Sequence, residues 1–439
     1  MVAPVDIGLI ALYLLAVAFI GYRSSRKESK KDYLIASKNL GVWDNIATLS
    51  ATKITASIII TFVALVYLFG ISTLWAYVGT GIGYILFLYF ALKIKREGDK
   101  YNYNSMSDYF FHHYGTVTGK IVSFIIFLTI FINFTVQLIG GATIIKALTG
   151  LAFIWGVLLC GIVVLFYLYL GGFKAVVKTD VVQFVAIVVL FFILGVFLFS
   201  NFTFESSHWN PLSGGAKFII PMLLVGILFP FSAPDLWQRA IAAKDTRSLK
   251  KSFIITTILY LLFGFLLGII ALTIRLKLPA ANPDTALVQG FALMLPPGLL
   301  GFGLVALFAA IMSSADSYAF ISSEVLMHSL IGRKKTLSSL KHGILGIMLA
   351  GMIFAILFQS IIKASFLLVG LFMVMSVAVI ATWIKPNIKK ITLNTTIIFG
   401  IISTLAMIPF IGFTAMMVVI GIGSGLLGLI IGAILSIVF

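Results

Sequence analysis

Apolar runs of about 18 residues or more recur along almost the whole chain, and this limits its fold more than any other feature. Of the 439 residues, 61% are hydrophobic and only 10% are charged, and the mean hydropathy is +1.15. A soluble domain could not bury that much apolar surface and still present enough polar surface to water. The sequence therefore predicts an all-α integral membrane protein, with residues 1–439 forming a single transmembrane domain.

Dividing the apolar runs into segments long enough to cross the bilayer predicts about 13 transmembrane helices. They start near residues 4, 42, 72, 117, 150, 175, 217, 251, 297, 340, 364, 395 and 416. The connections on one side of the membrane carry 25 of the 31 Lys and Arg residues, and positively charged loops remain in the cytoplasm. We therefore expect a multi-pass cell-membrane protein with its N-terminus outside and its C-terminus cytoplasmic. The net charge of +17 is then explained without nucleic-acid binding.

Two of the predicted helices carry polar or helix-breaking residues near their middle. The second span contains Ser50, Thr52, Lys53, Thr55 and Ser57 between apolar flanks, and residues 229–235 of the seventh read Phe-Pro-Phe-Ser-Ala-Pro-Asp. Simple proline kinks are one explanation. Discontinuous helices at corresponding positions of two halves are, however, typical of inverted-repeat transporters. The spacing favours a 5+5 inverted repeat of helices 2–6 and 7–11, with one extra N-terminal helix and two extra C-terminal helices.

The ninth span has a stripe of small and hydroxyl side chains on one face. Ala310, Ser313, Ser314 and Ser317 follow helical spacing, and Asp316 lies beside them. Close packing between helices could account for the serines alone. An acidic residue at membrane depth is costly and points to a function. Hydroxyls facing carbonyls freed by a broken helix would suit a hard cation such as sodium.

Several stretches of the chain resemble the sodium:solute symporter family. The most specific is GGFKAVVKTDVVQ at 171–183, between the fifth and sixth spans. The others are DYLIASK at 32–38, QLIGGA at 137–142, QRAIAAKD at 238–245 and AAIMSSADS at 309–317. The resemblance implies a LeuT-type inverted repeat and a secondary transporter, not an enzyme. Such a transporter moves a small-molecule solute by alternating access, with sodium as the coupling ion and no other cofactor.

The resemblance also implies where the ions would bind. The main sodium site would use the backbone carbonyls of Ala51, Ile54 and Ala310 and the hydroxyls of Ser313 and Ser314. A second cation or proton site, present in some members, would map to Asp180, Ser313, Asp316 and Ser317.

Lys53 departs from the family pattern, which has a neutral or acidic residue at that point of the second span. An ammonium near a sodium site would repel the ion. Lys53 could pair with Asp316, either as a tethered cation in place of sodium or as a proton carrier, or it could point away. Sodium coupling is therefore the first hypothesis, and proton-coupled or uncoupled transport is the alternative.

The substrate pocket is expected between the two broken helices and the fourth span. Its candidate lining residues are Ser57, Asn133, Gln137, Phe231 and Ser232. Ile58 stands where sugar-carrying members have a polar residue, which favours an organic acid or an amino acid. A membrane-embedded enzyme or a channel is a weaker alternative, because neither a catalytic metal motif nor a ring of like charges is evident. Beyond the lipid bilayer and the solute, no obligatory protein partner is evident.

Overall fold

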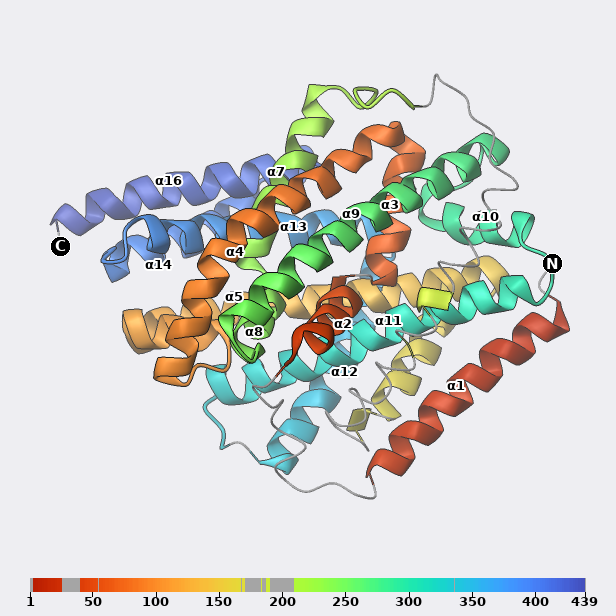
Figure 1. The fold of residues 1–439 in the computed structure, drawn as a ribbon, viewed down its shortest axis with the longest axis horizontal. Coiled ribbons are helices and arrows are strands. Elements are labelled where there is room, and N and C mark those ends of the chain that lie inside the picture. The colour runs from red at the N-terminus through yellow and green to blue at the C-terminus, as the bar shows by residue number, and fades with distance from the viewer. Residues whose placement is uncertain are drawn as a thin grey trace.

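A computed structural model of the protein describes residues 3–25, 40–53, 55–166, 168–169, 183, 187–189, 209–334 and 336–438. These residues are almost entirely helical (Figure 1). The helices are α1 (Pro4–Ser25), α2 (Val42–Lys53), α3 (Ala56–Phe69), η1 (Gly70–Leu74), α4 (Trp75–Tyr101), α5 (Met106–Thr149), α7 (Ala216–Ser232), α8 (Pro234–Ala242), α9 (Thr246–Lys277), η3 (Pro283–Thr285), α10 (Ala286–Met294), α11 (Leu299–Glu324), η4 (Val325–Leu330), α12 (Leu337–Phe358), α13 (Ile361–Ile384), α14 (Lys390–Ala406), α15 (Ile408–Ile411) and α16 (Met416–Val438).

Among the described residues, eight helices are long and apolar enough to cross a membrane, or nine if the bent pair α7 and α8 is one span. Shorter apolar helices cover Pro4–Val17 and Phe153–Phe166. One of the two longest candidates, Ile58–Tyr101, contains the 3₁₀ turn η1, where Gly70 has a φ of 72° and the chain changes direction between α3 and α4 (Figure 1). The described residues thus support a multi-pass membrane protein, and the number thirteen stays a prediction.

Glycine allows the helices around the centre to approach closely. A Cβ placed on Gly226 of α7 would lie 2.3 Å from the carbonyl oxygen of Ala76 in α4, and one on Gly79 of α4 would lie 2.3 Å from that of Leu223. Helix pairs in lipid gain stability mainly from such close contact, since the lipid is as apolar as the side chains. α4 and α7 therefore form a tight pair that holds one broken helix in place.

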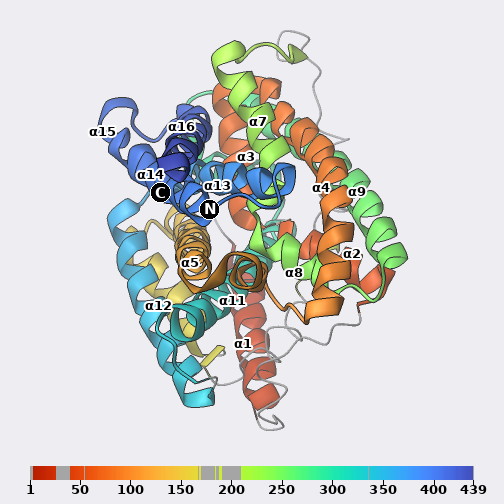
Figure 2. The same cartoon turned by 90° about the vertical axis from the view of Figure 1, so that its left-hand side faces the viewer.

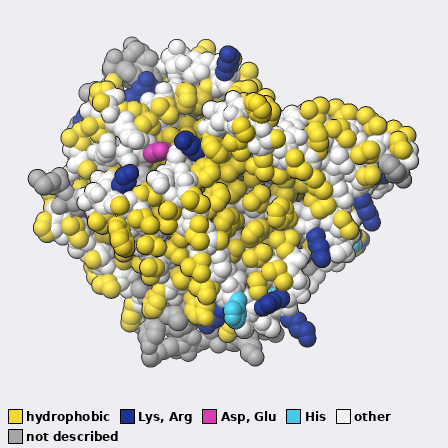
Figure 3. Space-filling model, turned by 180° about the vertical axis from the view of Figure 1, so that it is seen from behind, with side chains coloured by type: hydrophobic (Ala, Val, Ile, Leu, Met, Phe, Trp, Pro, Cys, Tyr) yellow, Lys and Arg dark blue, Asp and Glu magenta, His cyan; other side chains and the backbone are white. Residues whose placement is uncertain are grey.

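The periphery of the bundle is formed by the first and the last helices (Figures 1 and 2). α1 packs against α11 on one side, while α14 and α16 pack against each other and against α13 on another. Figure 3 shows a broad, continuous hydrophobic area, with charged side chains mainly toward its edges. This is the surface expected of a protein solvated by lipid.

Asp284, in the connection between α9 and α10, makes stability depend on pH. Burial raises the pKa of its carboxyl, although Ser360 donates a hydrogen bond to it at 3.3 Å. Because the pKa of Asp284 is higher in the folded than in the unfolded state, its protonated form stabilises the folded protein. This stabilisation is complete below the unfolded-state pKa and is lost as the pH rises through the folded-state pKa. We expect Asp284→Asn to raise the thermal midpoint at pH 7.5. This gain should shrink as the pH falls toward 4 and the native carboxyl protonates, which thermal unfolding in detergent at several pH values would measure. A pH-independent gain would contradict the assignment.

Candidate functional site

The two breaks in the spanning helices lie at the predicted positions. α2 ends at Lys53 and α3 begins at Ala56, with the hydroxyl of Thr55 accepting a hydrogen bond from the N–H of Ile58 at 3.2 Å. In the other repeat, Ala233 is extended between α7 and α8, which are bent by 48° relative to each other. Pro234 is suited to the first turn of α8, where its missing N–H costs nothing. Both helices therefore expose backbone groups at corresponding points.

An ion pair joins the two breaks. The ammonium of Lys53 lies 2.8 Å from Oδ2 of Asp235, and the two side chains are 4% and 12% exposed. Lys53 stands at the C-terminus of α2 and Asp235 in the first turn of α8, so each charge also complements the dipole of its own helix. The ammonium additionally sits 4.5 Å from the ring centroid of Phe229. The structure gives Lys53 an ion pair with Asp235, and its suggested pairing with Asp316 stays a prediction.

The half-helices α2 and α8 are also joined at their opposite ends. The N–H of Leu40 donates to the carbonyl of Ala242 at 3.0 Å, and the N–H of Lys244 donates to the carbonyl of Leu40 at 2.9 Å. This short backbone bridge precedes α2 and follows α8. Together, the bridge at one end and the ion pair at the other clamp the two half-helices into one unit.

The hydroxyl stripe of α11 is buried, and this helix contacts both α2 and α3. Ser313 and Ser314 are 7% and 4% exposed, Asp316 is fully buried, and Ser317 is half-buried. The hydroxyl of Ser314 donates to the carbonyl of Ala310 at 3.1 Å, so two of the expected sodium ligands already contact each other. Of the remaining candidates, Ala51 lies in the last turn of α2, while Ile54 and Asp180 fall outside the described residues.

Two cavities lie near the breaks. The polar cavity has a volume of 310 Å³ and is lined by residues that include Asp108, Asn133, Asp235, Gln238, Glu324 and His328. The aromatic cavity has a volume of 190 Å³, and its walls include Phe62, Tyr77, Asn133, Phe229, Tyr260 and Phe366. Asn133 lines both, and the ring of Phe229 stacks edge-on against Phe372 of the polar cavity at 4.9 Å. The Lys53 ammonium contacts Asp235 of the polar cavity and the Phe229 ring of the aromatic one, so it connects the walls of the two cavities.

The predicted substrate residues fall into different surroundings. Asn133 lines both cavities, and Gln137, one turn further along α5, is fully buried. Phe231 lies outside both cavities, packed against Phe87, Phe90 and Trp383. The hydroxyl of Ser232 donates to the carbonyl of Phe229 at 3.2 Å. The side chain of Ser57 lies outside the described part of the chain.

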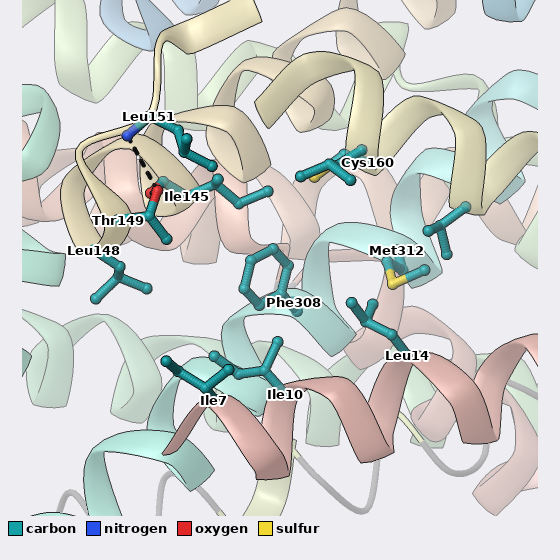
Figure 4. A pocket seen from close by; sticks show the side chains of 12 residues that line it. Ile7, Ile10, Leu14, Ile145, Leu148, Thr149, Leu151, Cys160, Phe308 and Met312 are labelled. Atoms are coloured by element: carbon teal, nitrogen blue, oxygen red, sulfur yellow. Dashed lines mark hydrogen bonds between the residues drawn. The ribbon is translucent and has the colours of Figure 1, made fainter. Parts of the chain in front are cut away.

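A third cavity, of 540 Å³, lies on the other side of α11 (Figure 4). Side chains of α1, of the end of α5 and of α11 surround it, including Ile7, Leu148, Phe308 and Met312. Its lining is almost wholly apolar, and Ile7 and Leu159 are more than half exposed at the protein surface. This composition suits lipid chains, and the hydroxyl of Thr149, which lines the cavity, already bonds to the backbone of Ile145 and Leu151.

Asp235 and Tyr260 are site residues that the sequence reasoning passed over. Asp235 was visible as an acid directly after the second break, and an acid in that position calls for a cation. Tyr260 lies in a continuous apolar run of α9, and nothing in its local sequence distinguishes it from a residue that faces lipid.

Comparison with known proteins assigns the family. Residues 33–335 match the family model described as the sodium:solute symporter family. The chain belongs to the sodium:solute symporter family. It is therefore a membrane transporter and not an enzyme.

Curated proline transporters are similar to this protein along most of the chain. Sodium/proline symporter 2 of Staphylococcus saprophyticus is 25% identical over 411 residues, covering 86% of this chain and 75% of that protein. The osmoregulated proline transporter OpuE of Bacillus subtilis is 25% identical over 346 residues, covering 73% and 70%.

Solved structures of two transporters show the fold. A Na⁺-coupled sialic acid symporter in a substrate-bound outward-open state matches with a TM-score of 0.80 and 17% identity, covering 100% of this chain and 98% of that one. Mhp1, a nucleobase-cation-symport-1 family transporter, matches with a TM-score of 0.64 and 13% identity, covering 90% and 92%. The LeuT-type fold that the family resemblance implied is thereby confirmed.

Proposed function

We propose that this protein is a sodium-coupled symporter that moves a small organic acid or amino acid across the cell membrane by alternating access. Its N-terminus is outside and its C-terminus cytoplasmic, as the distribution of Lys and Arg favours. Family membership, the LeuT-type fold and the likeness to two proline transporters support this function.

The observation that carries sodium coupling is the 2.8 Å ion pair of Lys53 with Asp235. A lone ammonium beside the break would repel a sodium ion strongly in a medium of intermediate dielectric. Because Asp235 neutralises that ammonium, the sodium ligands proposed on α2 and α11 can bind a cation without opposing a net positive charge. In this proposal, sodium binds the carbonyls of Ala51, Ile54 and Ala310 and the hydroxyls of Ser313 and Ser314.

The second cation or proton site stays a proposal of the same kind, with Asp180, Asp316 and Ser317 as its residues. Asp316 supports it because this acid is fully buried in α11 one turn from the other ligands. For the solute, Asn133 is the best supported of the candidate residues, because its side chain lines both cavities next to the breaks.

Sodium should raise the thermal midpoint of the purified protein in detergent, whereas potassium at equal ionic strength should not. Ser314→Ala should weaken the apparent sodium affinity by about tenfold or more, the scale on which metal sites respond to loss of a contact. The midpoint is measured against sodium concentration, since a ligand that binds only the folded state stabilises it by mass action.

Ser323→Ala is the matched control for that experiment. Ser323 is fully buried on the same helix, and its hydroxyl donates to the carbonyl of Ala319 at 2.6 Å, as Ser314 does to Ala310. Its replacement should leave the sodium response unchanged. If sodium and potassium act alike on the native chain, or if both variants lose the response equally, the sodium site is refuted and proton-coupled or uncoupled transport becomes the working function.

A further inference from the structure

The aromatic cavity lacks an obvious partner for a charged solute. Among the described residues that line it, none has a charged side chain, and its polar groups are hydroxyls and the amide of Asn133. Such walls can hold the apolar body of a small molecule. An anionic group on that molecule would still need a counter-charge, because an unpaired buried charge is strongly unfavourable.

Lys53 can supply that counter-charge. Its ammonium lies 4.5 Å from the ring centroid of Phe229, and this ring is part of the wall of the aromatic cavity. Asp235, its ionic partner, lines the polar cavity instead. Lys53 itself lines neither cavity: its ammonium contacts Asp235 in the wall of the polar cavity and the Phe229 ring in the wall of the aromatic one, and a solute carboxylate would reach it past that ring.

We propose that Lys53 binds the carboxylate of the transported solute and that Asp235 is the internal anion which this carboxylate displaces. One ammonium among apolar walls can balance a single negative charge, so the solute is a monocarboxylate or a zwitterion and not a dianion. Exchanging one carboxylate for another leaves Lys53 paired throughout, and the displaced carboxylate of Asp235 turns into the polar cavity that it already lines. The role assigned to Lys53 rests on the proposed function, because it requires that these cavities carry the solute.

The exchange would link solute binding to movement of the half-helices. Asp235 is one end of the clamp between α2 and α8, and the backbone bridge of Leu40 with Ala242 and Lys244 is the other. Displacing Asp235 opens the clamp only at the end next to the polar cavity. A solute that binds in the aromatic cavity would thereby break the ion pair of Lys53 with Asp235. Breaking this contact between the walls of the two cavities would let the solute pass toward the polar cavity, as alternating access requires.

The test is binding of defined probes to the purified full-length chain, measured by thermal shift and by calorimetry in sodium. The probes are L-proline, pyruvate and propionate, with L-prolinamide and propionamide as controls that lack the carboxylate.

The variants separate the two charges. Asp235→Asn should bind a carboxylate more tightly than the native chain, because Asp235 no longer competes for Lys53. The double variant Lys53→Gln/Asp235→Asn should bind it about tenfold more weakly or worse than the native chain, as expected for loss of a charged hydrogen bond. The charge-swapped variant Lys53→Asp/Asp235→Lys keeps an ion pair and provides a folded comparison if Asp235→Asn is unstable; it should also lose the carboxylate.

The outcomes separate this role from a purely structural one. A structural ion pair predicts that Asp235→Asn binds no better than the native chain and that the charge-swapped variant binds normally, and either result would overturn the proposal. Equal binding of a carboxylate and its amide, or no binding of any carboxylate probe, would overturn it as well. The rise of the thermal midpoint with sodium is measured on the same samples without solute. Its absence in the native chain would refute the proposed sodium coupling and would leave the role of Lys53 to be judged by the carboxylate probes.

Discussion

Asp235→Ala should lower the free energy of unfolding by about 3–5 kcal/mol, the cost of removing one partner from a buried ion pair. The substitution leaves the ammonium of Lys53 only 4% exposed, near the centre of the bundle and without its carboxylate. The neighbouring Phe229 ring attracts the ammonium but cannot replace a full negative charge. Equilibrium unfolding in mixed detergent micelles, followed by tryptophan fluorescence, measures the change.

Two further variants make this expectation specific. Lys93 pairs with Glu97 at 3.8 Å, but its side chain is 48% exposed, so Lys93→Ala should cost less than about 1 kcal/mol. The double variant Lys53→Met/Asp235→Leu should recover most of the lost stability, because apolar replacement of a whole buried pair is often neutral. If Asp235→Ala lowers the free energy of unfolding no more than Lys93→Ala does, Lys53 and Asp235 do not form a desolvated ion pair.

The fold could be predicted because lipid imposes simple rules on the sequence. Apolar runs had to be helices, and residues that interrupt such runs had to mark irregular backbone facing a cavity or a ligand. Pro234 and the polar cluster around Lys53 therefore located both breaks. The number of spans is less certain from sequence, since a turn such as η1 at Gly70 lies within one continuous apolar run.

The site was harder to predict because it depends on how the half-helices are rotated. The sequence reasoning treated Asp316 as the acid at membrane depth that could pair with Lys53 and did not weigh Asp235, which follows the second break. Asp235 meets Lys53 because α2 and α8 lie antiparallel, joined by the backbone bridge at Leu40 at one end and by the ion pair at the other. Phe231 illustrates the same limit. The indole N–H of Trp237 donates to its carbonyl at 2.9 Å, and its ring packs into an aromatic cluster outside the cavities.

Asp6 links the extra N-terminal helix to the helix that carries the candidate sodium ligands. Its side chain is fully buried, and Oδ1 accepts hydrogen bonds from the N–H groups of Gly298 and Gly301, each at 2.7 Å. The first N–H groups of a helix have no partner within the helix, and their end carries a partial positive charge. A carboxylate from α1 therefore caps the N-terminus of α11 across the interface between the two helices.

Asp6→Ala should lower the free energy of unfolding by about 2–4 kcal/mol, because it leaves the buried N–H of Gly301 and the part-buried N–H of Gly298 without an acceptor at the start of α11. The matched control is Asp245→Ala, which removes an exposed cap that accepts a local hydrogen bond from the N–H of Ser248 at 2.7 Å, and its loss should be smaller. If Asp6 also positions α11, the sodium-dependent rise in the thermal midpoint should decrease in Asp6→Ala and persist in Asp245→Ala. Equal losses of stability in the two variants would mean that the cap provided by Asp6 from α1 contributes no more than the local cap provided by Asp245. An undiminished sodium response in Asp6→Ala would show that α11 holds its sodium ligands without help from α1.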